Sequence, residues 1–140
     1  MRARPGGYRS VPHTADLRVE AWGPSREECL AQAVRGVCES FLDLAGAVEV
    51  RLREVAVRAD DDEDLLVALL DEVVYWLDAH DEVPVEAELA AVPGGLRARL
   101  HMADIAVLPV TGAAPKAVTL HGLVCGPGSG GWRCSVTLDV

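Results

Sequence analysis

The chain has 140 residues, half of them hydrophobic, and a formal net charge of −9 from 22 acidic and 13 basic side chains. This length suits a single domain over residues 1–140, with residues 1–10 expected to be flexible, and no apolar run reaches the roughly 20 residues of a membrane helix. No apolar stretch follows the N-terminal arginines, so we expect no secretory signal and a cytoplasmic protein. Phosphate backbones repel such a surface, so we expect a cation or a protein partner rather than direct nucleic-acid binding.

The first quarter of the chain predicts a strand and then a helix. Apolar and other residues alternate from Asp16 to Trp22, which is the period of a half-buried strand. Ser25 with Glu28 three residues later forms a capping box. Apolar residues then recur at helical spacing, which predicts a helix that runs to about Leu44.

The next segment predicts a second strand and a second helix. Apolar residues between 48 and 57 change phase near Arg53, which indicates a strand with a bulge at that point. An acidic cluster at 60–64 precedes a broad apolar face over 65–77, as expected of a helix whose first turn carries negative charge. Asp61 and Asp62 in this cluster are interpreted as capping and solvated residues, with a docking surface for a basic partner or extra metal ligands as the alternative.

The second half of the chain has the pattern of successive strands. We expect them at 85–92, 96–102, 105–110, 117–125 and 132–140, with glycine-rich turns at 93–95 and 126–131. The order strand, helix, strand, helix, then several strands predicts an α+β fold, with two helices packed on a mixed, largely antiparallel sheet.

The four cysteines do not have the spacing of a zinc site. Cys29 and Cys38 fall in the first predicted helix, and Cys125 and Cys134 flank a predicted hairpin. In a reducing compartment such residues are usually small buried apolar groups, and we expect that here.

Two carboxylates near opposite ends of the chain form the main candidate for a metal site. Asp16 begins the first predicted strand, and Asp139 lies near the end of the last, each out of phase with its apolar neighbours. If these strands are antiparallel neighbours, the two side chains converge. Together with the main-chain carboxylate of Val140 they would give oxygen ligands of the kind that calcium prefers. Without that pairing, both are solvated surface residues.

Three further polar residues have weaker claims to a role. His13 stands just before the first predicted strand, Lys116 is the only lysine in the chain, and His121 lies in a predicted strand. A surface charge explains Lys116, and a histidine with a satisfied hydrogen bond explains each of the others, more simply than a functional role does, because none shows a partner or metal-ligand spacing in the sequence.

Four segments in order along the chain resemble the archease family. They are His13-Thr14-Ala15-Asp16-Leu17 with Glu20-Ala21-Trp22-Gly23, Leu65-Leu66 with Asp71-Glu72-Val73-Val74-Tyr75, Lys116-Ala117-Val118-Thr119-Leu120-His121, and Trp132 to Val140. The chain departs from the family pattern in three places. Leucines stand at 69 and 70 where an aromatic residue is usual, Asp71 stands for a common asparagine, and Ala114-Pro115 precede the lysine.

The resemblance implies a helper protein rather than an enzyme. Archeases assist the RNA ligase that joins cyclic-phosphate ends to hydroxyl ends in tRNA splicing and RNA repair, by promoting guanylylation of the ligase and its turnover. Family members carry a divalent metal site, often with calcium. Carried over residue by residue, Asp16, Asp139 and Val140 would be the ligands, and His13, Asp61, Asp62, Lys116 and His121 are the other candidates for a functional or partner-binding role.

Two other functions remain open from the sequence alone. A metal-dependent hydrolase could use Asp16 and Asp139 with His13 or His121 around a catalytic ion. A general protein chaperone would need no metal. Turnover by the isolated protein would indicate a hydrolase rather than a helper. Stimulation that is specific to the ligase would indicate a helper rather than a general chaperone.

Overall fold

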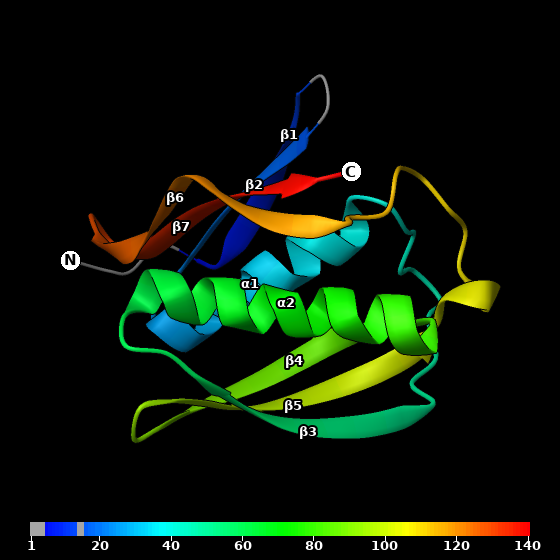
Figure 1. Ribbon diagram of the computed structural model, residues 1–140, viewed down its shortest axis with the longest axis horizontal. Coiled ribbons are helices and arrows are strands. Elements are labelled where there is room, and N and C mark those ends of the chain that lie inside the picture. Colours follow the sequence, from blue (N-terminus) through cyan, green and yellow to red (C-terminus); the bar gives the residue numbers. More distant parts are fainter. Residues whose placement is uncertain (1–4, 14–15) are drawn as a thin grey trace.

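Two helices lie between two antiparallel sheets in the computed structural model, which describes residues 5–13 and 16–140 (Figure 1). Strands β1 (Gly7–His13), β2 (Asp16–Gly23), β7 (Gly131–Asp139) and β6 (Ala117–Gly128) form one sheet in that order. Strands β3 (Arg51–Arg58), β5 (Gly95–Asp104) and β4 (Glu82–Val92) form the other. The helices are α1 (Arg26–Glu39) and α2 (Asp62–His80).

The predicted α+β class is confirmed, but the strands are divided between two sheets instead of one. Every neighbouring pair in both sheets is antiparallel, so the sheets are not mixed. Each sheet covers one side of the helix layer, which leaves the other side of each sheet facing outwards (Figure 1). Of the described helices, none is long and apolar enough to cross a membrane.

Both helices begin with the side-chain caps that the sequence predicts. The Ser25 hydroxyl accepts a hydrogen bond from the Glu28 N–H at 3.1 Å, and the Asp61 carboxylate accepts one from the Asp64 N–H at 2.8 Å. Each cap satisfies a backbone donor that has no partner inside the helix. The residues at which both helices begin are therefore fixed by the local sequence.

The core fills the space between the sheets with aliphatic side chains. Its largest fully buried members come from both helices and both sheets: Leu30, Leu66, Leu69, Leu70, Leu96, Leu100, Met102 and Leu138. All four cysteines are buried free thiols, as expected, and burial raises the pKa of Cys38 to about 12.

The first part of the fold differs from the sequence prediction at two points. Strand β1 begins at Gly7, within the stretch 1–10 that we expected to be flexible. Residues 1–4 of that stretch lie outside the described part of the chain. Helix α1 ends at Glu39 rather than near Leu44. The chain beyond it pairs instead with a later loop, since the Asp43 N–H donates to the Pro109 carbonyl and the Thr111 N–H to the Phe41 carbonyl, both at 2.9 Å.

The predicted bulge near Arg53 is wrong, because β3 pairs with β5 without a break in register. The apolar phase changes there because Arg53 occupies an inward position. Its guanidinium donates to both oxygens of buried Glu82, at 3.2 and 3.3 Å, and lies 4.5 Å from the centre of the Trp76 ring. A paired and stacked arginine can take a place that an aliphatic residue would otherwise fill.

The predicted strand at 105–110 is also wrong. Ile105–Val107 form a short 3-10 helix, and Val107 and Val110 are 72% and 75% exposed. The chain leaves the sheet after β5 and crosses to β6, and within this segment Leu108 is buried and Ile105 packs against the core.

His101, on the three-stranded sheet, contacts two acidic side chains: Glu49, which precedes β3, and Glu88 of β4. His101 Nδ1 lies 2.5 Å from Glu49 Oε1, and Nε2 lies 2.6 Å from Glu88 Oε1. Burial lowers the pKa of His101, but the hydrogen bonds with Glu88 and Glu49 raise it by more, so the pKa lies above its ordinary value of 6.5. Because the folded state holds the proton more tightly than the unfolded chain, protonated His101 stabilises the fold.

We therefore expect the contribution of His101 to be complete below pH of about 6.5 and to be lost as the pH rises through the raised folded-state pKa. The replacement His101→Gln should lower the melting temperature clearly at pH near 6 and much less at pH near 9. His121→Gln, which changes an exposed histidine on the other sheet, is the matched control. An equal loss at both pH values would show that the ring is held in neutral form.

Candidate functional site

The antiparallel pairing of β2 with β7 brings the two candidate metal ligands together. In the register of these strands Asp16 is the direct partner of Asp139, and the pairing continues through Val19 opposite Val136 to Gly23 opposite Trp132. The condition on which their convergence depends, that the two strands are antiparallel neighbours, is thus met. Directly opposite residues of an antiparallel pair project to the same side of the sheet, with Cβ atoms about 4.5–5.5 Å apart.

The two carboxylates lie on the outward side of the sheet. Their strand neighbours Val19 and Leu138 are fully buried on the inward side, while Asp139 is exposed and Asp16 is partly exposed. Like charges directly opposite each other in a sheet are destabilising. The pair is therefore a place where a bound cation would relieve repulsion between Asp16 and Asp139.

Lys116 and Val140 lie at the same end of β7, in a hollow of about 730 Å³ beside the C-terminal half of α2. The Lys116 N–H donates to the Asp139 carbonyl at 2.7 Å, which holds the start of β6 against the end of β7. Asp78 and Asp81 of the α2 end also line this hollow. The main chains of Lys116 and Val140 thus adjoin that of Asp139, whereas neither Asp16 nor Asp139 lines the hollow itself.

The carboxylates of Asp16 and Asp139 can hold a hard cation only if main-chain oxygens, water or a partner supply the remaining ligands. Among the residues that the structure describes, no group of three or more His, Cys, Asp and Glu side chains is arranged to hold a metal ion. Asp16 and Asp139 supply two carboxylates, and the Val140 main chain follows directly. Calcium accepts six to eight oxygen ligands, including main-chain oxygens and water, so the residues present fit part of such a shell.

The two candidate histidines have different relations to this pair. The main chain of His13 pairs with Asp16 at the end of β1, and its side chain lies outside the described part. His121 is exposed in the section of β6 where the pairing with β7 is interrupted, between Thr119 and Val124. His121 is therefore not among the residues that pair across the strands next to Asp16 and Asp139.

Asp61 and Asp62 lie at the other end of α2 and have local structural partners. Asp61 caps the helix, and the Asp62 carboxylate accepts a hydrogen bond from Arg26 Nη1 at 3.0 Å. The hollow with Lys116 and Val140 is lined by the opposite half of this helix. These two residues are thus not brought to the carboxylate pair, and their proposed partner-binding role stays a prediction.

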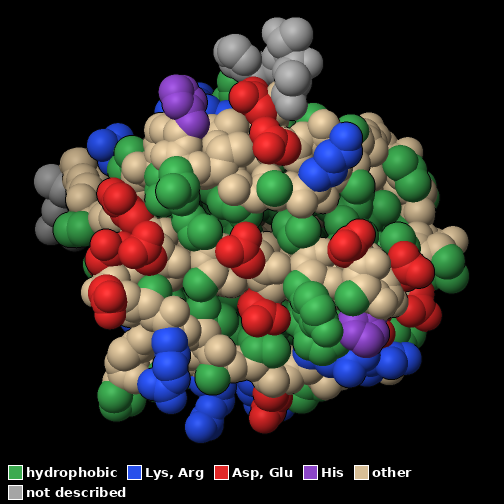
Figure 2. All heavy atoms as spheres, viewed as in Figure 1, with side chains coloured by type: hydrophobic (Ala, Val, Ile, Leu, Met, Phe, Trp, Pro, Cys, Tyr) green, Lys and Arg blue, Asp and Glu red, His purple; other side chains and the backbone are tan. Residues whose placement is uncertain are grey.

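Acidic side chains are nevertheless frequent along α2 and next to its two ends. Ten carboxylates and no Lys or Arg lie between Asp60 and Glu82. In Figure 2 the acidic side chains are spread across the band that α2 occupies, and the basic ones gather mainly along the edge near β3 and β5. A surface with this distribution of charge suits a basic partner.

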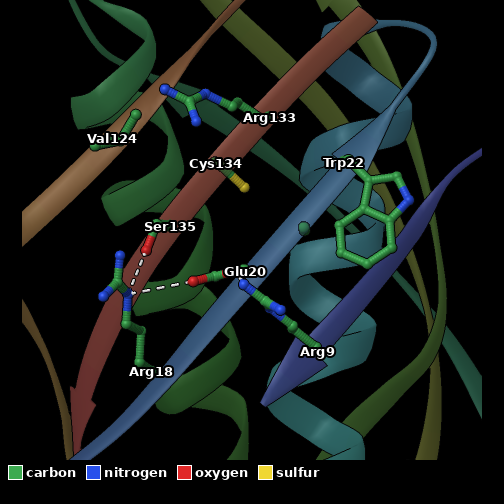
Figure 3. Close-up of a pocket in the computed structure, with 9 residues that line it drawn as sticks. Arg9, Arg18, Glu20, Trp22, Val124, Arg133, Cys134 and Ser135 are labelled. Carbon is green, nitrogen blue, oxygen red and sulfur yellow. Dashed lines mark hydrogen bonds and ion pairs between the residues drawn. The ribbon is translucent and has the colours of Figure 1, made fainter. Parts of the chain in front are cut away.

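A second polar feature on the outward side of the four-stranded sheet was not found from the sequence. Arg9, Arg18 and Arg133 surround a hollow on this face (Figure 3). The pairing of Asp16 with Asp139 could have predicted the position of Arg18 and Arg133. Every second residue of a strand lies on the same side of the sheet, so both arginines lie on the side of this pair. Arg9 could not be predicted in this way, because β1 was not expected.

The comparisons with known proteins agree with this fold. The model of the archease protein family matches residues 8–140. A protein of Mycobacterium tuberculosis (strain CDC 1551 / Oshkosh) named "Probable protein archease" is 53% identical over 134 residues, which cover 96% of this chain and 75% of that one. "Protein archease" of Pyrobaculum calidifontis is 34% identical over 125 residues and 84% of each chain.

Two solved structures share the fold. The solution structure of protein 1598 of Methanobacterium thermoautotrophicum superposes with a TM-score of 0.75 at 22% identity, over 96% of this chain and 99% of that one. The crystal structure of a Thermotoga maritima protein described as an archease and possible chaperone gives a TM-score of 0.65 at 20% identity, over 94% and 96%. With a family model that matches nearly its whole length and relatives above 30% identity, this chain belongs to the archease family.

Proposed function

We propose that this protein is a metal-binding cofactor protein that activates a tRNA-splicing RNA ligase, promoting guanylylation of the ligase and its repeated turnover. The observation that carries the proposal is the direct cross-strand pairing of Asp16 with Asp139. The family resemblance suggests the identity of the partner, and the facing carboxylates are where we propose that a divalent cation binds.

In this proposal Asp16, Asp139 and the Val140 main chain hold the ion, most suitably calcium, because all three offer hard oxygen ligands. When bound, the cation would neutralise the repulsion between the two strand ends. The protein's own residues fix the two carboxylates through strand pairing and hold the start of β6 beside them. The partner or water completes the shell.

The acidic face of α2 supports a protein partner with a basic surface. It also makes direct RNA binding unfavourable, so the RNA would be handled by the ligase. In this account the protein is a helper and not an enzyme: it acts on the ligase, and the ligase carries out the chemistry on the RNA ends. The cytoplasm, where we expected the protein, suits such a partner.

The first prediction concerns the cation. Asp139→Asn removes one of two facing charges, so without divalent ions it should leave stability unchanged or raise it by about 0.2–1 kcal/mol. Added calcium should raise the melting temperature of the unaltered protein by mass action and that of the variant much less. Glu86→Gln, at an exposed position on the other sheet, serves as the control. An equal calcium response in Asp139→Asn would remove the metal site from this account.

The second prediction concerns the partner. Asp16→Ala should abolish stimulation of the ligase from the same organism, measured as joined RNA per ligase molecule over several turnovers, while leaving circular dichroism and melting temperature nearly unchanged. Normal stimulation by the variant would make Asp16 a surface residue only. RNA cleavage by the isolated protein would instead favour a hydrolase, and equal protection of unrelated proteins from aggregation would favour a general chaperone.

Lys116 provides a third test at the same place. Its main chain is tied to Asp139, so Lys116→Ala changes the ammonium group and leaves the strand pairing intact. If the ammonium contacts the partner or its nucleotide, stimulation should fall most at low nucleotide concentration. Unchanged stimulation at all nucleotide concentrations would reduce Lys116 to a surface charge.

A further inference from the structure

Three arginines gather around one hollow on the outward side of the four-stranded sheet (Figure 3). The hollow has a volume of about 560 Å³, and Arg9, Arg18 and Arg133 reach it from β1, β2 and β7. Glu20 and Ser135 lie between the arginines, and Trp22 and Val124 line its sides. Pockets that bind small molecules typically have volumes of roughly 300–1,000 Å³.

The hollow is positively charged in a strongly negative protein. It contains three guanidinium groups and a single carboxylate, that of Glu20, whereas the chain as a whole carries a formal charge of −9. Glu20 pairs closely with Arg9, at 2.6 Å from Nε, and more distantly with Arg18, at 3.7 Å. One carboxylate therefore cannot neutralise the group, and an excess of positive charge remains.

Two of the arginines keep donors for a ligand. The Arg18 Nε–H donates to the buried Ser135 hydroxyl at 2.9 Å, which orients the guanidinium by its Nε edge and leaves the two terminal nitrogens. The Arg133 guanidinium forms no ion pair or side-chain hydrogen bond with any residue in the described part of the chain. Figure 3 shows Arg133 beside Val124, at the other end of the hollow from Arg18.

We propose that this hollow binds the phosphate group of a small phosphorylated molecule. A guanidinium presents its N–H donors in a planar fork that matches phosphate oxygens, and charge-assisted hydrogen bonds of this type are about twice as strong as neutral ones. Trp22 lines the same hollow, so the test below includes a nucleotide as well as simple phosphates.

A small ligand fits the charge distribution better than a nucleic acid. Asp16 and Asp139 lie in the row next to Arg18 and Thr137 on the same face, so a chain of phosphates that leaves the hollow in that direction meets two carboxylates. A single phosphate or a short polyphosphate stays within the arginine group. This inference does not depend on the ligase or on the cation, because it uses residues outside the proposed metal site.

The test is calorimetric titration of the isolated full chain, at fixed ionic strength and without divalent ions. The probes are inorganic phosphate, pyrophosphate and ATP, with a short single-stranded RNA for comparison. We expect pyrophosphate and ATP to bind more tightly than phosphate. ATP that binds more tightly than pyrophosphate would mean that the base contacts the protein, and equal affinity would mean that only the phosphates do; both results support the site.

Arg18→Gln and Arg133→Gln should each weaken the binding of pyrophosphate about tenfold, since each removes charge-assisted hydrogen bonds. Ser135→Ala keeps every charge and should weaken it less, by releasing Arg18. The matched control is Arg97→Gln, which removes the same charge from an exposed position on the other sheet and should bind normally. Melting temperatures of all four variants show that they are folded.

Three results would overturn the proposal. They are no measurable binding of any probe, an equal loss in Arg97→Gln, and single-stranded RNA that binds more tightly than ATP with the same dependence on Arg18 and Arg133. The second would mean attraction by general charge, and the third would mean a nucleic-acid surface. None of these outcomes bears on stimulation of a ligase, so the two proposals can fail separately.

Discussion

The antiparallel pairing of β2 with β7 is the constraint on which the candidate site depends. It joins residues from near the two ends of the chain, and its register is held by apolar side chains that face the helix layer. Val19 lies opposite Val136, and both are fully buried, as is Leu138. A slip of one residue would turn these side chains outwards, so the core fixes which polar residues meet on the other side. Asp16 and Asp139 face each other because hydrophobic burial leaves no alternative.

The same register arranges the outward face of this sheet as a series of rows with changing charge. The row of Asp16 and Asp139 is followed by Arg18 with Thr137, then by Glu20 with Ser135, and then by Trp22 with Arg133. A cation would suit the first row and a phosphate the others. Asp78 and Asp81, at the end of α2, line a separate hollow with Val140 at the same end of β7. One face of one sheet thus presents two surfaces of opposite electrostatic character.

Much of this arrangement could be predicted from the sequence, because it depends on local periodicity and capping. The alternation around Val19 predicted β2, and the caps at Ser25 and Asp61 predicted where both helices begin. The conditional prediction that Asp16 meets Asp139 required only that the first and last predicted strands be neighbours. Family resemblance identified the same residues independently of their pairing.

What could not be predicted depends on contacts between distant segments. Arg53 interrupts the apolar pattern of β3 because Glu82 of β4 and Trp76 of α2 provide its partners. The early end of α1 depends on hydrogen bonds to the loop that contains Pro109. Strand β1, which contributes Arg9 to the phosphate hollow, has few large apolar residues, and it forms because β2 provides a paired edge. No local pattern carries this information.

The central claim is that the joint ends of β2 and β7 hold a divalent cation. The most direct measurement is a calcium titration of isotopically labelled protein, followed by the backbone amide resonances. The account predicts saturable shifts concentrated at residues 16–17 and 138–140, with those at the N-terminal turn of α2 nearly unchanged. Shifts centred on residues 60–64, or weak shifts spread over all acidic surfaces without saturation, would contradict it and leave the facing pair of Asp16 and Asp139 without a bound ion.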